Sequence, residues 1–311
     1  MKKSDIKNIL TCIEKQLRKN KCIRNTIPYR YTVLKNIALI GCGAIGYEIA
    51  QSIDKKQIPN CRVSALFDED NERLNRLMHS LINKPDGIYN NFDDFISSTV
   101  FNETHFVIEA ASIDAAERYS VTLLERGKDI MVMSTGSFSN AAFNDRILSL
   151  IREKGRKVYL PSGAVGGSDI IRAVRGYIDE VLLITTKSIN SIKGAPFFAK
   201  RKISADTIEE KTVIFEGTAE EAITEFPSNI NVSALISMAG IGFYRTRVMV
   251  IVDPFITTNQ HEIKVKWRFG EFYIKINNYP SPSNPKTSYL AVLSAIECLK
   301  SALSNNIQIG S

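Results

Sequence analysis

The order of hydrophobic and polar positions changes character at about residue 163 of the 311-residue chain. Before that point, short apolar runs alternate with stretches whose apolar residues recur at helical spacing. The apolar runs lie at 33–41, 62–70, 104–112, 129–136 and 157–163, and the helical stretches at 43–55, 71–82, 113–128 and 142–156. Strands that alternate with helices in this way predict a doubly wound parallel sheet, which is an α/β architecture.

After this point, alternating apolar and polar residues predict five further strands. They lie at 180–188, 211–217, 245–253, 261–269 and 271–278, with helices predicted at 168–178 and 229–242. Such alternation is typical of a sheet with one covered face. We therefore predict a second α/β (α+β) domain built on a mostly antiparallel or mixed sheet.

The C-terminal stretch 284–303 predicts a helix with Asn284 as its cap and Pro285 in its first turn. Its apolar stripe needs a partner, and we expect the helix to pack back against the first domain. The stripe consists of Leu290, Leu293, Ile296 and Leu299.

Composition is that of a globular chain, with 44% hydrophobic and 23% charged residues. No apolar run approaches the roughly 18 residues of a membrane span, and the first residues do not resemble a secretory signal. We therefore expect a cytoplasmic protein that does not bind a membrane. The five cysteines are scattered and the three histidines dispersed, which predicts reduced thiols and no metal site.

The formal charge of +7 is concentrated near the N-terminus, where residues 1–35 carry ten Lys and Arg against two acids. Residues 1–32 are therefore predicted to be a basic extension. Apolar residues at helical spacing allow it to form an amphipathic helix; they are Ile6, Leu10, Ile13 and Leu17. A helix that packs on the main body or on a second subunit is favoured over an anionic-surface binder, so nucleic acid is not expected as a partner.

Three glycines, Gly41, Gly43 and Gly46, separate a predicted strand from a predicted helix in the segment IALIGCGAIGYEIAQSI. Asp68 ends the next strand, 22 residues after Gly46. This context predicts a dinucleotide site, because the glycines let the backbone approach a pyrophosphate at a helix N-terminus. The Asp68 carboxylate would accept hydrogen bonds from ribose hydroxyls and repel a 2′-phosphate. The sequence therefore favours NAD over NADP, although Arg73 nearby leaves NADP use open.

Histidine positions suggest one candidate for proton transfer. His79 and His105 fit packing or surface positions, whereas His261 begins a predicted strand two residues after Asn259. A neutral imidazole there could move a proton at physiological pH, and a structural role is an equal alternative on spacing alone. The glycine cluster LPSGAVGGSD at 160–169 is expected to expose backbone amides close to a nicotinamide; an interdomain hinge is the competing interpretation, and the two are compatible.

A wider set of segments resembles the L-aspartate dehydrogenase family. These segments are GCGAIG, VIEAAS, VMSTGSF, LPSGAVGGSD, FPSNINVSALISMAG, NQHEI, FGEF and NYPSPSNPKTSYLAVLSAI. They follow the family's order from about residue 36 to about residue 303, so the resemblance covers nearly the whole chain except the basic extension, which has no counterpart in the typical pattern. Segments such as PSGAVGG, NINV and NPKTS are far more specific than the glycine motif.

The resemblance implies a Rossmann-type dinucleotide-binding domain at 33–162, a substrate and catalytic domain at 163–284 and a C-terminal helix within 285–311. It also implies a homodimer that oxidises L-aspartate with NAD(P) to iminosuccinate. Iminosuccinate then hydrolyses to oxaloacetate and ammonia or supplies NAD synthesis. The reverse reaction would take oxaloacetate and ammonium.

By position, the family's catalytic histidine falls on His261, and Asn259 is expected to orient it or the substrate. Expected cofactor contacts are Gly41, Gly43, Ala44, Ile45, Gly46, Asp68, Ala111, Ser112, Ala164 and Asn231. A dicarboxylate also needs cationic partners; Lys286 is the first candidate, with Lys187 and Lys193 weaker, and a solvated surface position is an equal alternative for each lysine.

Two other functions remain open at the level of sequence. A dehydrogenase of another amino or imino acid would keep the same fold, because only the pocket of the second domain separates the substrates. A noncatalytic NAD(H)-binding sensor is the second alternative, and the complete N-x-H-E motif around His261 argues against it.

Overall fold

The computed structural model describes residues 34–227, 231–281 and 284–304, with secondary structure alone at residues 280, 281 and 284–287. By its internal contacts the chain divides into two units, Met1–Leu34 and Lys35–Ser311. Only Leu34 of the first unit is described, so the predicted basic extension and its apolar stripe lie outside the described residues. All described helices and strands belong to the second unit, and none of these helices is both long and apolar enough to cross a membrane.

A six-stranded sheet forms the first half of this unit, in the order β3-β2-β1-β4-β5-β6. The strands are β1 (Lys35–Ile40), β2 (Cys61–Phe67), β3 (Gly87–Tyr89), β4 (Phe106–Glu109), β5 (Asp129–Val132) and β6 (Val158–Tyr159). Every neighbouring pair is parallel. This sheet confirms the predicted Rossmann-type fold. The strand order reverses between β1 and β4, which is where such sheets bind ligands outside their carboxyl ends.

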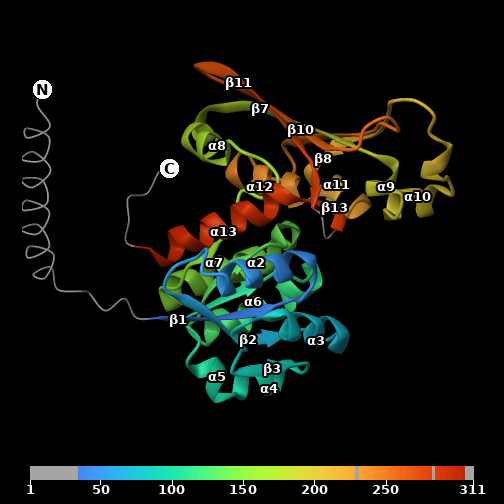
Figure 1. Cartoon of the computed structure of the whole chain (residues 1–311). Helices are drawn as coiled ribbons and strands as arrows, with labels where there is room; N and C mark the ends of the chain where they lie inside the picture. Colours follow the sequence, from blue (N-terminus) through green and yellow to red (C-terminus); the bar gives the residue numbers. More distant parts are fainter. Residues whose placement is uncertain (1–33, 228–230, 282–283, 305–311) are drawn as a thin grey trace, which may run out of the picture. The chain divides into compact units, whose positions relative to one another are not determined.

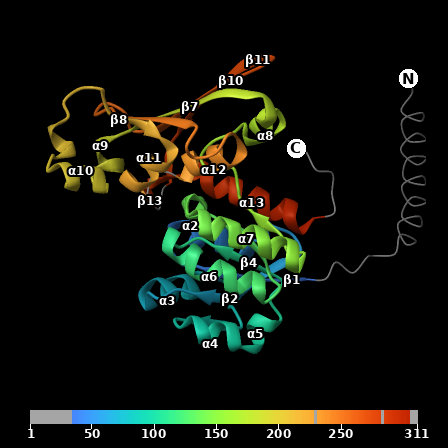
Figure 2. The same cartoon turned by 180° about the vertical axis from the view of Figure 1, so that it is seen from behind.

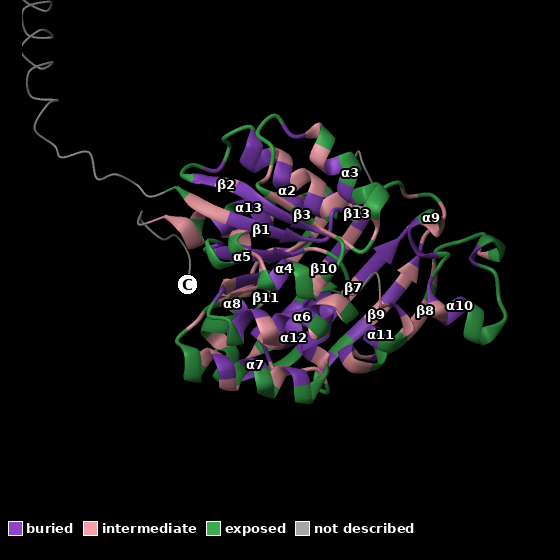
Figure 3. Cartoon of the chain, turned by 90° about the horizontal axis from the view of Figure 1, so that it is seen from below, coloured by how far each residue is buried: buried purple, intermediate pink, exposed green. Residues whose placement is uncertain are grey.

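Helices cover both faces of this sheet (Figures 1 and 2). One face packs against α2 (Ala44–Asp54), α3 (Asn71–Ser80) and α13 (Tyr289–Leu303), and the other against α4 (Phe92–Ser97), α5 (Thr99–Asn102), α6 (Ile113–Glu125), η1 (Thr135–Ser139) and α7 (Ala141–Lys154). Successive side chains of a strand point to opposite faces. Accordingly, Ile37 and Leu39 of β1 join the first cluster, whereas Ala38 and Ile40 join the second. Figure 3 shows β1 and β2 largely buried between these layers.

A mixed five-stranded sheet forms the second half, in the order β11-β10-β7-β9-β8. The strands are β7 (Ile178–Lys187), β8 (Thr212–Thr218), β9 (Thr246–Val252), β10 (Asn259–Trp267) and β11 (Gly270–Asn278). Only the β7–β9 pair is parallel, which confirms the predicted mixed sheet. The helical segments of this half are α8 (Ser168–Val174), η2 (Arg175–Tyr177), α9 (Ile189–Ile192), α10 (Pro196–Arg201), η3 (Ala205–Thr207), α11 (Ala219–Glu225) and α12 (Asn231–Ala239).

The start of the C-terminal helix differs from the sequence prediction. Residues Asn284–Ser288 form the strand β13, which pairs with β12 (Pro280–Ser281) in an antiparallel hairpin, and α13 begins only at Tyr289. The prediction that Asn284 and Pro285 open the helix was therefore wrong. An Asn-Pro pair also suits extended backbone, because proline disfavours helical conformation in the residue before it.

The buried face of α13 is also shifted from the predicted stripe. Leu293 is 46% exposed and Leu290 is only partly buried. Ile296 and Leu299 of the stripe are buried, and Val292 and Ala295 are buried in place of the other two; all four share an apolar cluster with α2 and β1. Helix α13 therefore packs on the six-stranded sheet, although it follows the five-stranded sheet in the sequence.

Candidate active site

Close backbone contacts shape the glycine turn between β1 and α2. Gly41 has a φ of +94°, and a Cβ added there would lie 2.7 Å from the backbone of Ala110. A Cβ on Gly46 would lie 1.9 Å from the carbonyl oxygen of Gly41, so a larger residue would push α2 away from the turn. Nothing lies within 4 Å of a Cβ on Gly43, which precedes α2 without a side-chain cap. The turn therefore leaves room for a phosphate at the helix N-terminus.

An outer hollow of about 370 Å³ opens beside this turn. It brings together the predicted cofactor contacts Gly41, Gly43, Asp68, Ala111 and Ser112. One oxygen of Asp68 accepts the Cys42 N–H at 2.7 Å, and the other accepts the Asp70 N–H at 2.9 Å. These bonds hold the carboxylate at the rim of the hollow, and each oxygen keeps a second lone pair for a ribose hydroxyl.

Two arginines of the outer hollow are already paired with acids. Arg73 Nε lies 3.0 Å from an Asp70 oxygen, and Arg118 lies 2.7 Å from Glu69. Tyr119 also donates to Glu69 at 2.7 Å. Because its cations are engaged in this way, the hollow suits a ribose with free hydroxyls better than one with a 2′-phosphate.

Residues from both halves of the described unit line an inner cavity of about 140 Å³. Ile45, Met133 and Thr135 come from the first half, and Lys187, Asn231 and His261 from the second. Residues 161–164, in the predicted glycine cluster, line it as well. Ile45 lies only two residues after Gly43 of the outer hollow, so one extended ligand could occupy both spaces. Ala44 begins α2 between them and lines neither space.

His261 and Lys187 meet in the inner cavity on neighbouring strands. His261 is 2% exposed on β10, and its Nδ1 lies 3.1 Å from the hydroxyl of Thr185, its register partner on β7. Lys187, two residues along β7, is 4% exposed. Burial, together with the charge of Lys187, lowers the pKa of His261 to about 3, and burial lowers the pKa of Lys187 to about 8. The imidazole is therefore neutral at physiological pH, and the same shift makes it a weaker base than a free imidazole.

Of the remaining predicted residues of this region, Asn231 and Ala164 line the cavity and Asn259 does not. Asn259 is fully buried beside His261 in sequence, and neither polar atom of its side chain has a hydrogen-bond partner within the described part of the chain. Asn231 begins α12, where its side-chain oxygen accepts the Gly136 N–H at 3.2 Å. Ala164 lines the cavity and accepts a 2.7 Å hydrogen bond from Asn278.

The three candidate lysines have different environments. Lys187 lines the cavity, whereas Lys193 is exposed at the end of α9. Lys286 lies on β13 rather than at a helix N-terminus, and its side chain is outside the described part of the structure. In the described ranges, no group of three or more His, Cys, Asp or Glu residues could hold a metal ion.

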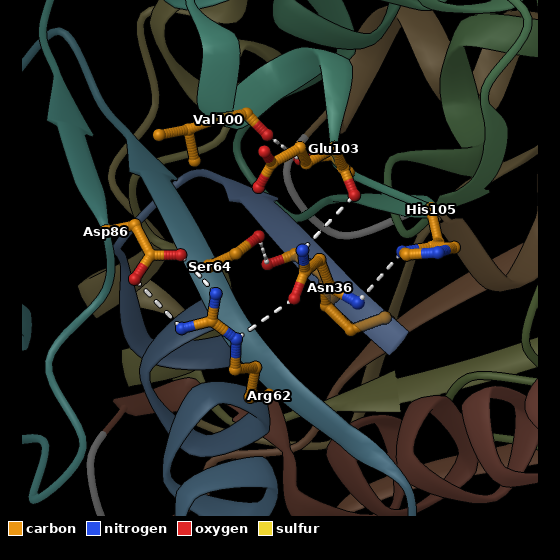
Figure 4. Close-up of polar contacts among 9 residues, drawn as sticks. Asn36, Arg62, Ser64, Asp86, Val100, Glu103 and His105 are labelled. Atoms are coloured by element: carbon orange, nitrogen blue, oxygen red, sulfur yellow. Dashed lines mark hydrogen bonds and ion pairs between the residues drawn. The ribbon is translucent and has the colours of Figure 1, made fainter. Parts of the chain in front are cut away.

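The other two histidines lie away from both spaces. His79 is exposed near the end of α3. His105 precedes β4 and accepts the Asn36 N–H at the amino edge of the sheet, where Arg62 links the side chains of Asn36 and Asp86 (Figure 4). This polar network joins the starts of β1, β2 and β4, so it belongs to the edge opposite the glycine turn.

Comparison with known proteins decides the family. The family "Aspartate dehydrogenase, C-terminal" matches residues 169–302, and "Homoserine dehydrogenase, NAD binding domain" matches residues 41–161. L-aspartate dehydrogenase of Nitrosopumilus maritimus is 39% identical over 277 residues, which cover 89% of this chain and 100% of that protein. The chain belongs to the aspartate dehydrogenase family. The Methanosarcina barkeri L-aspartate dehydrogenase is 43% identical, over 88% of this chain and 98% of that protein.

Solved structures agree with this family at the level of the fold. Aspartate dehydrogenase of Thermotoga maritima superposes with a TM-score of 0.67 at 24% identity and covers 88% of this chain and 99% of that chain. A scyllo-inositol dehydrogenase of Lactobacillus casei, solved with NAD(H) and scyllo-inositol, reaches a TM-score of 0.56 at 12% identity, over 89% of this chain and 91% of that chain. The predicted family and fold are therefore confirmed.

Two buried residues of this aspartate dehydrogenase family member escaped the sequence prediction. Thr185 and Lys187 are two residues apart on β7, so their side chains lie on the same face of the strand. This spacing is the pattern that could have marked Thr185. Glu109 is 1% exposed at the end of β4, directly after three apolar residues. A carboxylate within such an apolar run is the pattern that could have marked it.

Proposed function

We propose that the protein oxidises L-aspartate to iminosuccinate with NAD(P), or runs the reverse reductive amination of oxaloacetate. The observation that carries this proposal is the inner cavity, where a buried lysine and a neutral histidine share the lining with Ile45 from the first turn of α2. The family supports the same activity, because several relatives with this name match nearly the whole described chain.

The outer hollow would hold the adenosine and pyrophosphate of the cofactor. Gly43 and the first turn of α2 would bind the phosphates, and Asp68 would accept the ribose hydroxyls. The bound cofactor would supply a hydride acceptor at its nicotinamide ring. We propose NAD as the preferred form, with NADP as a weaker substitute, because Arg73 and Arg118 are paired with their own acids.

Lys187 would bind one carboxylate of the substrate. It is a buried cation in the described lining of the cavity, and a carboxylate there would offset the cost of its desolvation. Lys286 stays a proposed second partner, because it lies on β13 two residues before Ser288, which lines the cavity.

His261 would carry the proton chemistry. Its neutral ring would take a proton from the substrate amine in the oxidative direction and return one in reverse. A bound dicarboxylate beside Lys187 would offset the lysine's charge and raise the pKa of the ring towards the range that this transfer needs. Thr185 holds Nδ1, and Asn259 is proposed to orient the ring or the substrate. The reaction removes a hydride and a proton from L-aspartate to give iminosuccinate, which water converts to oxaloacetate and ammonia.

The direct test is an oxidation assay across substrates. NADH or NADPH formation would be followed with L-aspartate, D-aspartate, L-glutamate and L-alanine, after NADH binding has been shown. We expect turnover with L-aspartate and a higher rate with NAD. Faster turnover of another amino acid would reassign the substrate, and no turnover by NADH-binding protein would favour a sensor.

We also propose a cytoplasmic homodimer that supplies iminosuccinate to NAD synthesis, as the family resemblance implies. The second sheet has a hollow that is a candidate surface for a contact between copies; it is lined by Leu182, Val265, Phe272 and Tyr273 and by the charged residues Glu180, Lys264, Lys266 and Glu271. Light scattering coupled to size exclusion would give the mass in solution, and a monomer at micromolar concentration would contradict the dimer.

A further inference from the structure

The carboxylate of Glu109 is buried where the two halves of the candidate site meet. It is the last residue of β4, after the buried residues Phe106–Ile108, and it is 1% exposed. Burial raises the pKa of this carboxyl, and hydrogen bonds from Ala111, Ser134 and Ser112 oppose that rise. A charge buried at this depth is retained only where several donors satisfy it.

Those donors come from two different loops. Oε1 accepts the Ala111 N–H at 2.7 Å and the Ser134 hydroxyl at 2.9 Å, and Oε2 accepts the Ser134 N–H at 3.1 Å. Ala111 follows β4, whereas Ser134 follows the neighbouring strand β5. One carboxylate thus ties together the loops that leave adjacent parallel strands at the carboxyl edge of the sheet.

The first loop belongs to the outer hollow. Ala110, Ala111 and Ser112 line it. The loop also abuts the glycine turn, because a Cβ on Gly41 would lie 2.7 Å from the nitrogen of Ala111. A nucleotide seated on the turn would therefore restrain this loop.

The second loop belongs to the inner cavity. Met133 and Thr135 line it on either side of Ser134. The Thr135 hydroxyl donates to the carbonyl of Asn231 at 2.8 Å, and the Gly136 N–H donates to the side chain of the same asparagine. Through these two hydrogen bonds the second loop connects to α12, which packs on the second sheet.

We propose that Glu109 is a positioning residue that couples occupancy of the nucleotide hollow to the geometry of the substrate cavity. Restraint of loop 110–112 passes through the carboxylate to loop 133–136 and on to Asn231. Binding of either ligand then raises the affinity for the other, and the size of this effect depends on how firmly Glu109 joins the two loops. This inference rests on the proposed function, because it takes the inner cavity as the site of a dicarboxylate.

The test compares wild type with Glu109→Gln. Glutamine keeps the shape of the glutamate side chain but replaces one acceptor oxygen by an NH₂ group. The groups of both loops that face this side chain are donors, so at least one of them loses its acceptor. NADH fluorescence titrations with and without saturating succinate, a dicarboxylate that cannot react, give the coupling factor. We expect NADH and succinate to tighten each other about tenfold in wild type and to bind almost independently in the variant.

Asp54→Asn is the matched control. Asp54 is also a buried acid that accepts backbone N–H groups, from Ile82 and Asn83 at 2.7 and 2.9 Å, but it lies in neither loop. We expect this variant to keep the full coupling even if it loses stability. If Glu109→Gln does not fold, Ser134→Ala removes a single hydroxyl donor and should reduce the coupling severalfold.

The outcomes separate the two proposals. A wild-type enzyme that turns over aspartate but binds NADH and succinate independently would overturn the coupling alone, as would a Glu109→Gln variant with coupling intact. Absence of both succinate binding and aspartate oxidation in wild type would overturn the proposed function and the coupling together.

Discussion

At the residue scale, His261 and Lys187 show how burial prepares two groups for opposite tasks. Burial lowers the pKa of both, to about 3 for the imidazole and about 8 for the ammonium. At neutral pH the histidine is therefore uncharged and the lysine is still mostly a cation. The proposed role of Lys187 as carboxylate partner follows from its charge, whereas proton transfer by His261 needs a bound anion that raises its pKa.

Substitution of His261 tests the first role. We predict that His261→Ala lowers turnover by about 10²–10⁴, because a positioned general acid or base is lost. NADH binding should be largely unchanged, since His261 does not line the outer hollow. Steady-state rates with oxaloacetate, ammonium and NADH measure the loss, and His105→Ala at the opposite edge is the control. Unchanged turnover would remove the assigned role.

Substitution of Lys187 tests the second role through stability and pH. Since the pKa falls from 10.5 to about 8 on folding, the buried ammonium costs roughly 3 kcal/mol below pH 8. The wild type should therefore gain stability as the pH rises from 8 towards 10.5. Lys187→Met should be more stable than wild type at pH 7, by up to that amount, with an advantage that shrinks over the same pH range.

The same variant should bind the dicarboxylate poorly. We expect the KM for oxaloacetate to rise at least tenfold, because the buried partner of one carboxylate is removed. Urea unfolding at several pH values and steady-state kinetics supply both measurements. A less stable variant with an unchanged KM would show that Lys187 is structural.

At the residue scale the sequence singled out His261 and the glycine turn because each belongs to a local motif; the structure places them at the two spaces of the candidate site, and their roles stay predictions. The sequence ranked Lys286 above Lys187 because Lys286 stood at a predicted helix N-terminus, and because an alternating strand does not reveal which face adjoins the cavity. Glu109 was overlooked for a similar reason. Its partners Ala111 and Ser134 follow different strands, so their meeting depends on the pairing of β4 with β5.

At the element scale, two glycines of the turn before α2 have different roles: Gly46 lets the helix pack closely, and Gly43 is proposed to leave space for a ligand. We predict that Gly43→Ala folds with unchanged stability but binds NADH at least tenfold more weakly, because the added methyl enters the open space proposed for the pyrophosphate. Gly46→Ala should instead lower the melting temperature, since its methyl meets the Gly41 carbonyl. Thermal melts and NADH titrations of both variants check this contrast. Equal effects of the two variants on either measurement would refute it.

Element prediction succeeded where periodicity is local and failed where pairing is distant. Strands β1, β2 and β7–β11 follow patterns visible within a few residues. The segment Asn284–Ser288 looked like a capped helix start, but its pairing with β12 makes it a strand. Capping signals describe one end of a segment and contain no information about a neighbouring strand.

At the scale of the whole molecule, α13 joins the end of the chain to the first sheet's core. Leu299 is fully buried there, whereas Leu293 on the same helix is 46% exposed. We predict that Leu299→Ala lowers the free energy of unfolding by about 2–5 kcal/mol and that Leu293→Ala changes it little. Urea unfolding measures both changes. A similar loss in the two variants would contradict the packing of α13.

The central claim is that the protein converts oxaloacetate and ammonium to L-aspartate, with the inner cavity as its active site. The most direct measurement incubates the protein with oxaloacetate, ¹⁵N-ammonium and NADH and identifies the products by mass spectrometry and chiral chromatography. The account predicts ¹⁵N-labelled L-aspartate in a one-to-one ratio with NADH consumed, and no NADH consumption when ammonium is omitted. Malate formation without ammonium, or no labelled aspartate from protein that binds NADH, would contradict it.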